Sequence, residues 1–146
     1  MTPTWLNTKP PIFTNSGSTI ASYSPVFSRL EFDLGARVSK RMDANSATGV
    51  AGFMITDRAS KVTIDPEAVA EATKAIWGDL EAATARQITA LIGAQTGNKF
   101  QGQFEGVSEA VSYGDRTGIR TNQISYNVER ATIDATESAA FQLKFY

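Results

Sequence analysis

The chain has 146 residues, of which 42% are hydrophobic and 20% charged, and its formal net charge is −1. This length and composition are typical of one globular domain with a sizeable core, and the lack of a basic block argues against a protein that reads nucleic-acid sequence. Histidine and cysteine are both absent, which excludes disulfides, thiol nucleophiles, the commonest general base and the usual zinc ligands.

Residues 1–25 are predicted to form an extended N-terminal arm or linker ahead of a single domain over residues 26–146. Most of the prolines fall between Pro3 and Pro25, and proline cannot donate a hydrogen bond in a central strand. A short strand is expected near Ser18–Ser22. The arm docks on a neighbour, packs on its own domain or is the cut end of a longer protein, and the sequence leaves these alternatives open.

The next part of the chain alternates between apolar and polar residues as pleated strands do. Period-2 patterns predict strands over Val26–Leu34, Ala36–Met42, Val50–Thr56 and Lys61–Ile64. Gly35 marks a bend, residues 43–49 form a loop and Asp57–Ser60 forms a polar turn. The basic residues in Ala36–Met42 indicate a solvated edge strand.

An amphipathic helix is predicted over residues 65–77. Asp65 is a suitable N-cap, Pro66 suits the first helical position, and Glu67 places negative charge beside the positive helix end. One helical face collects Val69, Thr73, Ile76 and Leu80. Gly78 is expected to end the helix after Trp77.

The C-terminal half is predicted to consist of strands separated by glycine-containing turns. Alternation predicts strands at Arg86–Ile92, 100–105, Val107–Tyr113, Ile119–Glu129 and Ala140–Tyr146, the last with Phe141, Leu143 and Phe145 facing inward. Gly106 is expected to separate two strands, Gly114–Gly118 to form a tight turn, and residues 93–98 and 130–138 to form loops. The pattern indicates a mainly β fold, an antiparallel β-sandwich or curved sheet with one flanking helix.

The charged residues of the turns do not form a catalytic pattern. Asp57–Arg58 and Asp115–Arg116 either bind an anion or a partner, or cap their own turns, and capping is favoured because no second acid lies at motif spacing. A serine nucleophile would have only lysine as its base, and no hydrolase, phosphate-loop or DxDxDG-like motif is present. We therefore expect no enzyme activity, no cofactor and no metal site. No stretch approaches the length of a membrane span.

Exposed strand edges have the clearest functional implication. Unpaired backbone donors and acceptors at an edge invite pairing with another chain. Lys40 and Arg41 would guard one edge, whereas a head-to-tail ring would close other edges with symmetry-related copies. These patterns alone do not choose between such a ring and a monomeric binding module.

An ordered set of short motifs resembles one known family. The motifs are FDLG at Phe32–Gly35, RMDAN at Arg41–Asn45, GFMITDR at Gly52–Arg58, IDPEAV at Ile64–Val69 and YGDRTGIR at Tyr113–Arg120. Their order resembles the C-terminal part of the tail tube (major tail) proteins of long-tailed bacteriophages, over Leu30–Tyr146. Members of that family are longer, with another β-rich part ahead, so the chain resembles either an isolated C-terminal domain or a shorter relative.

The resemblance implies a tail-tube-like β-sandwich whose copies form stacked rings, through which DNA passes without specific binding. The partners would be other copies and other tail proteins, with no membrane and no small-molecule substrate. The protein would lie in the virion tail after synthesis in the host bacterial cytoplasm. Structural or inter-subunit roles would fall on Asp57, Arg58, Asp65, Pro66, Glu67, Tyr113, Gly114, Asp115, Arg116, Gly118 and Arg120. Acidic residues are expected to predominate in the lumen, where they let DNA slide.

Two other functions stay open. A monomeric β-sandwich binding module would recognise a host glycan or protein through an exposed aromatic cluster on one rim, such as Trp5, Tyr113 and Tyr126. A tail terminator or connector protein would share a related fold and would also lie in the tail.

Overall fold

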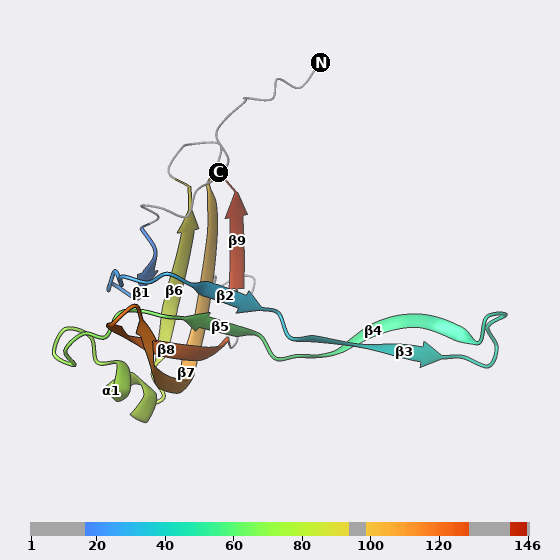
Figure 1. Ribbon diagram of the computed structural model, residues 1–146. Coiled ribbons are helices and arrows are strands. Elements are labelled where there is room, and N and C mark those ends of the chain that lie inside the picture. Colours follow the sequence, from blue (N-terminus) through green and yellow to red (C-terminus); the bar gives the residue numbers. More distant parts are fainter. Residues whose placement is uncertain (1–16, 94–98, 129–140, 146) are drawn as a thin grey trace, which may run out of the picture.

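The protein is mainly β with one short helix, in a computed structural model that describes residues 17–93, 99–128 and 141–145 (Figure 1). The elements are β1 (Thr19–Ile20), β2 (Leu30–Asp33), β3 (Ala36–Met42), β4 (Val50–Arg58), β5 (Lys61–Ile64), α1 (Ile76–Glu81), β6 (Ala85–Ile92), β7 (Phe100–Arg116), β8 (Ile119–Val128) and β9 (Phe141–Phe145). All pairings between these strands are antiparallel. The predicted fold class is confirmed.

The strands form two sheets. The seven-stranded sheet has the order β1-β6-β7-β8-β5-β2, with β9 also paired to β7, whereas β3 and β4 form a separate two-stranded hairpin. β9 and β8 occupy successive stretches of one edge of β7, at Phe100–Phe104 and Gly106–Arg116, and β6 pairs with the opposite edge. The long strand β7 therefore connects the two halves of the sheet.

The predicted strand break at Gly106 is wrong, because β7 runs through it. A Cβ on Gly106 would lie 2.5 Å from the carbonyl oxygen of Asn127, so this glycine permits the close approach of β8 instead of ending the strand. A register shift between Ser108 and Ala110 marks a bulge in β7, and bulges bend and twist a strand. In Figure 1, β2 and β5 accordingly run across the direction of β6 and β9.

The core lies between the crossing parts of the curved sheet. The ring of Phe32 in β2 packs against Phe104 in β7 and Phe141 in β9, with centroids 4.7 and 4.9 Å apart, although β2 pairs with neither strand. The buried apolar side chains are Ile20, Val62, Ile64, Ile76, Ile88, Ala90, Phe104, Ile124, Tyr126 and Val128. Ile20 lies in the short strand expected near Ser18–Ser22, so this part of the predicted arm packs on the sheet.

The predicted bounds of the helix, 65–77, are wrong. Residues 65–68 are extended because both sides of the backbone are already bonded: the N–H of Glu67 donates to Val26 O (2.7 Å) and that of Ala68 to Arg120 O (2.9 Å). Pro66 O accepts from the N–H of Asn122 at 2.8 Å. These tertiary hydrogen bonds outweigh a modest helix preference. Helix α1 starts only at Ile76 and includes Gly78, which was expected to end it.

Other boundaries shift by less. β3 and β5 have the predicted bounds, β2 covers only part of Val26–Leu34, and Asp57 and Arg58 remain in β4. The tight turn shrinks to Thr117–Gly118. In β9, Leu143 and Phe145 are exposed instead of inward, whereas the ring of Phe141 packs against Phe32. The predicted loops at 94–98 and 130–138, and residues 1–16, lie outside the described residues.

Candidate functional site

The β3–β4 hairpin projects from the body of the protein as a long two-stranded arm (Figure 1). Every residue of β3 is exposed. Large apolar side chains are exposed on both strands, namely Val38, Met42, Phe53, Met54 and Ile55. Phe53 is 74% exposed. Single exposed apolar residues are normal, but a group of them on one projecting element is typical of a protein–protein contact surface.

The hairpin depends on its own pairing. β3 and β4 pair with each other and with no third strand among the described elements, and an isolated two-stranded hairpin is only marginally stable in water. The loop that joins β3 to β4 is stabilised by hydrogen bonds within itself. Asp43 Oδ1 accepts the N–H of Asn45 at 2.9 Å, and Gly49 O accepts the N–H of Asp43 at 3.1 Å. A partner that covers the apolar side chains would therefore stabilise the arm.

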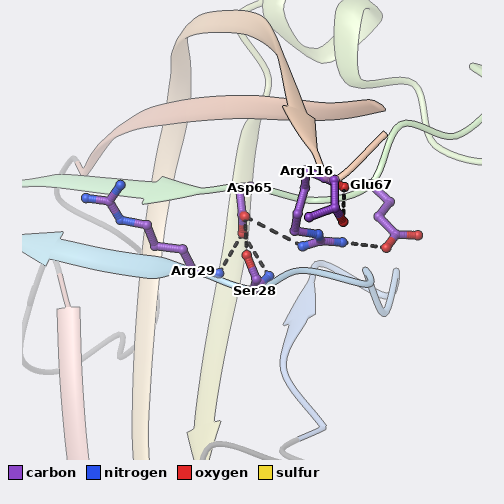
Figure 2. A network of polar contacts seen from close by, with 6 residues as sticks. Ser28, Arg29, Asp65, Glu67 and Arg116 are labelled. Atoms are coloured by element: carbon purple, nitrogen blue, oxygen red, sulfur yellow. Dashed lines mark hydrogen bonds and ion pairs between the residues drawn. The ribbon is translucent and has the colours of Figure 1, made fainter. Parts of the chain in front are cut away.

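A polar network surrounds Asp65 (Figure 2). Its Oδ1 accepts the backbone N–H of Ser28 at 2.9 Å and that of Arg29 at 2.6 Å, while Oδ2 accepts the Ser28 hydroxyl at 2.5 Å. Arg116 Nη1 lies 3.6 Å from Asp65 Oδ2, and Arg116 Nη2 donates to Glu67. Asp65 thus fixes the chain ahead of β2 instead of capping a helix.

The pKa of Asp65 lies below its usual value. Burial alone would raise the pKa, but hydrogen bonds from the Ser28 hydroxyl and from the Arg29 and Ser28 backbone, with the charge of Arg116, outweigh it. The ionised carboxylate is therefore part of the folded structure, and the network joins the loop before β2 to the end of β7.

A second cluster lies where β7 and β8 approach their turn. Tyr113 is opposite Asn122 and Asp115 is opposite Arg120, so Tyr113 and Arg120 are diagonal neighbours on one face. The Arg120 guanidinium lies over the Tyr113 ring, 3.6 Å from its centroid. Trp77 of α1 contacts the same ring, with centroids 5.4 Å apart. Together they border a hollow of about 430 Å³.

The turn residues act locally. Asp115 Oδ1 accepts the Gly118 N–H at 3.2 Å, and Gly118 has a φ of +85°, which favours glycine. A Cβ on Gly114 would lie 2.7 Å from Thr121 Oγ1. Asp57 Oδ1 accepts the Arg58 N–H at 2.8 Å. The structure thus groups Asp65, Pro66, Glu67 and Arg116, and separately Tyr113 and Arg120; Asp57 and Arg58 lie apart, on the hairpin.

Helix α1, which carries Trp77, also holds a buried charge that was not predicted from the sequence. Asp79 is 5% exposed, and its carboxylate accepts from Arg86 Nη2 at 2.5 Å, from Arg86 Nε at 3.0 Å and from Lys74. Burial opposes its ionisation, but the hydrogen bonds and charges of Arg86 and Lys74 outweigh it, and the pKa of Asp79 lies below its usual value. This triad fixes α1 against β6.

The aromatic rim expected for a binding module is not formed as predicted. Tyr126 is 3% exposed and belongs to the core, where burial raises the pKa of its phenol. Trp5 lies outside the described residues. Tyr113 is exposed, but its aromatic partner is Trp77. The signal that was missed is the strand register, which places Tyr113 at the end of β7 nearest α1.

Among the described residues, no three metal-ligating side chains lie close enough together to hold an ion. The six-residue α1, the one helix in these ranges, is too short to cross a membrane. No protein family model, curated protein or solved structure matches this chain.

Proposed function

We propose that this chain is a structural subunit that assembles with copies of itself: a tail tube subunit of a long-tailed bacteriophage, or the C-terminal domain of one. The observation that carries the proposal is the projecting β3–β4 hairpin with its exposed apolar side chains. The ordered motifs favour a tail tube over other self-assembling proteins. The proposal involves no enzyme activity and no cofactor.

Covering the exposed apolar side chains of the hairpin contributes several kcal/mol to a subunit contact. A phenylalanine side chain buries about 150–250 Å², and Phe53 is 74% exposed, so about 150 Å² remains available. At about 25 cal/mol per Å² this is worth roughly 3–4 kcal/mol. Met42 and Ile55 lie on the same face of the hairpin as Phe53 and add to it, and the lost freedom of the two copies offsets part of the sum.

The body of the same chain offers an apolar groove that suits the hairpin of a second copy. The groove has a volume of about 490 Å³ and is lined mainly by Leu30, Phe32, Ile92, Phe100, Phe104 and Leu143. Arg29 and Glu31 also border it and form an ion pair with each other. An arm on one surface and a groove on another make a head-to-tail contact, which generates a ring where the rotation closes.

This proposal divides the motif residues into two groups. Asp65, Glu67 and Arg116 bond within the subunit and shape its body. Asp57 and Arg58 lie at the base of the hairpin, where their charges would contact a neighbouring copy. Stacked rings of such subunits would form the conduit for DNA in the virion tail, in contact with other tail proteins.

The test uses the absence of native cysteine. The variant Arg29→Cys/Lys40→Cys replaces two charged residues, one at the border of the groove and one opposite Phe53 on the hairpin, so the apolar contact stays intact. Oxidation should link one copy's hairpin to the next copy's groove and give a ladder of covalent oligomers on a reducing-agent-free gel. Each single variant should give dimers at most. The control Lys40→Cys/Ile119→Cys places the second thiol at the exposed β7–β8 turn and should give no ladder. A control ladder of equal strength, or none from either double variant, would contradict the proposed contact.

A further inference from the structure

The β3–β4 hairpin joins the body of the protein at a narrow junction. β3 follows β2 after Leu34 and Gly35, and β4 leads into β5 through Ala59 and Ser60. Because β2 pairs with β5 and β3 pairs with β4, these two short connections lie side by side and carry the whole hairpin. Figure 1 shows the hairpin leaving the body at this point, beyond β2 and β5. The direction of the hairpin is therefore decided at the two connections.

The two connections touch each other closely. Gly35 has a φ of +57°, which favours glycine, and a Cβ at this position would lie 2.2 Å from the carbonyl oxygen of Ala59. The N–H of Ala59 donates to Gly35 O at 3.3 Å, and the N–H of Gly35 donates to Asp33 Oδ1 at 2.9 Å. The backbone of the junction therefore has a defined conformation in which any side chain at Gly35 would displace one connection.

Ser60 fastens the junction to the seven-stranded sheet. It is only 6% exposed, and its hydroxyl donates to Leu34 O on the other connection at 3.0 Å. Its own carbonyl oxygen accepts the N–H of Val128, the last residue of β8, at 2.9 Å. Because β8 pairs with both β5 and β7, Ser60 links both connections to the middle of the sheet. Water does not readily replace a bond made by a buried hydroxyl.

We propose that this junction holds the hairpin at one fixed angle to the body and that Ser60 is its positioning residue. A hairpin on a flexible link would sample many directions, and contact with a partner would then cost the free energy of ordering it. A fixed angle removes that cost before the contact forms. The inference concerns the hairpin within one copy, so it does not depend on the proposed tail tube or on the surface that the hairpin contacts.

The experiment measures the distance from the hairpin to the body by double electron–electron resonance between two spin labels. The chain has no native cysteine, so Lys40→Cys on the hairpin and Gln87→Cys in β6, both at exposed positions, carry the labels. This parent variant also carries Phe53→Ala, so that contacts between copies do not hold the hairpin. Dilution with unlabelled Phe53→Ala chain restricts the measurement to distances within one copy. The parent should give a single narrow distance peak.

Three substitutions in the labelled parent test the junction, and circular dichroism checks that each variant is folded. Ser60→Ala should raise the fraction of molecules outside the main peak about fivefold, which corresponds to the loss of one neutral hydrogen bond. The matched control is Ser46→Ala, which removes a serine hydroxyl bond of the same length, 3.0 Å to Val50 O, but within the hairpin loop. It should leave the distribution unchanged. Gly35→Ala should displace the peak, because the added Cβ forces the connections apart.

Three results would overturn the proposal. The first is a broad distribution in the parent, which would mean that the hairpin has no fixed angle. The second is a Ser60→Ala distribution no broader than that of Ser46→Ala, which would exclude Ser60 as the positioning residue. The third is an unmoved peak in folded Gly35→Ala, which would show that the close contact does not set the angle.

Discussion

Asp65 offers the sharpest test of how the chain is held between β2 and β7. In the structure its carboxylate accepts two backbone N–H groups on Oδ1 and the Ser28 hydroxyl on Oδ2. Net hydrogen bonds to charged groups are worth about 1.5–3 kcal/mol each, but the three share one carboxylate and do not add fully. Asp65→Ala should therefore lower the free energy of unfolding by about 3 kcal/mol.

The variant Asp65→Asn distinguishes the observed role of Asp65, which holds the backbone of Ser28 and Arg29, from the helix N-cap that the sequence predicted. The amide oxygen can still accept both backbone donors, but the NH₂ group faces Arg116 in place of Oδ2. The loss should be about 1.5 kcal/mol, half that of alanine. At a helix N-cap, Asn and Asp are nearly equivalent and alanine costs about 1 kcal/mol.

Urea unfolding followed by circular dichroism measures these differences from the midpoints at constant m-value. The matched control is Asp115→Ala, which removes a single, longer carboxylate–backbone bond of 3.2 Å in an exposed turn and should cost about 1–1.5 kcal/mol. The reasoning is refuted if Asp65→Asn is as stable as the wild type, or if Asp65→Ala costs no more than Asp115→Ala.

Four further outcomes follow from the structure. Asp79→Asn leaves Lys74 and Arg86 without their carboxylate and should cost about 3 kcal/mol in urea unfolding; a loss below about 1 kcal/mol would contradict the triad. The folded pKa values of Asp65 and Asp79 lie below the ordinary 3.8, so near this pH the folded state binds fewer protons than the unfolded state. The two carboxylates therefore stabilise the fold fully above about pH 4, and this stabilisation is lost as the pH falls further. The melting temperature should fall on acidification below about pH 4, and it should fall less steeply with pH in Asp79→Asn than in the wild type. Equal pH dependence in the two proteins would contradict a role for the Asp79 carboxylate. Gly106→Ala places a Cβ 2.5 Å from a carbonyl oxygen of β8 and should cost about 2 kcal/mol by thermal unfolding; a neutral result would refute the close approach. Phe53→Ala should change monomer stability by less than about 0.5 kcal/mol yet weaken self-association about thirtyfold in sedimentation velocity; unchanged association would exclude the hairpin from the contact.

The strands were predictable where one face of the sheet is buried. Alternation identifies β5 and β6, whose buried residues Val62, Ile64, Ile88 and Ala90 are two apart. The helix was misplaced because Asp65, Pro66 and Glu67 carry good local signals for a helix start. In the structure their hydrogen bonds go to distant parts of the chain, namely the segment before β2, at least 36 residues away, and strand β8. No local pattern reveals such partners. The same applies to Gly106, which is needed for a close approach that only the folded sheet shows.

The candidate sites were predictable in part. A two-residue turn at Thr117–Gly118 sets the register that makes Tyr113 and Arg120 diagonal neighbours, so this pair follows once the turn is placed correctly. The run Phe53-Met54-Ile55 resembles a buried strand, because apolar residues on both faces usually indicate burial. Its partner strand β3 is polar and exposed, and that mismatch was the available signal for a projecting hairpin.

Copies of this chain should form rings through the hairpin, and direct imaging tests this expectation most directly. Negative-stain electron microscopy of the full chain at high protein concentration should show rings with a central opening, stacked into tubes. A tail terminator or connector would give rings without tubes. The variant Phe53→Ser/Met54→Ser should show neither. Particles of monomer size alone in the wild type, or rings that persist in the variant, would contradict the account.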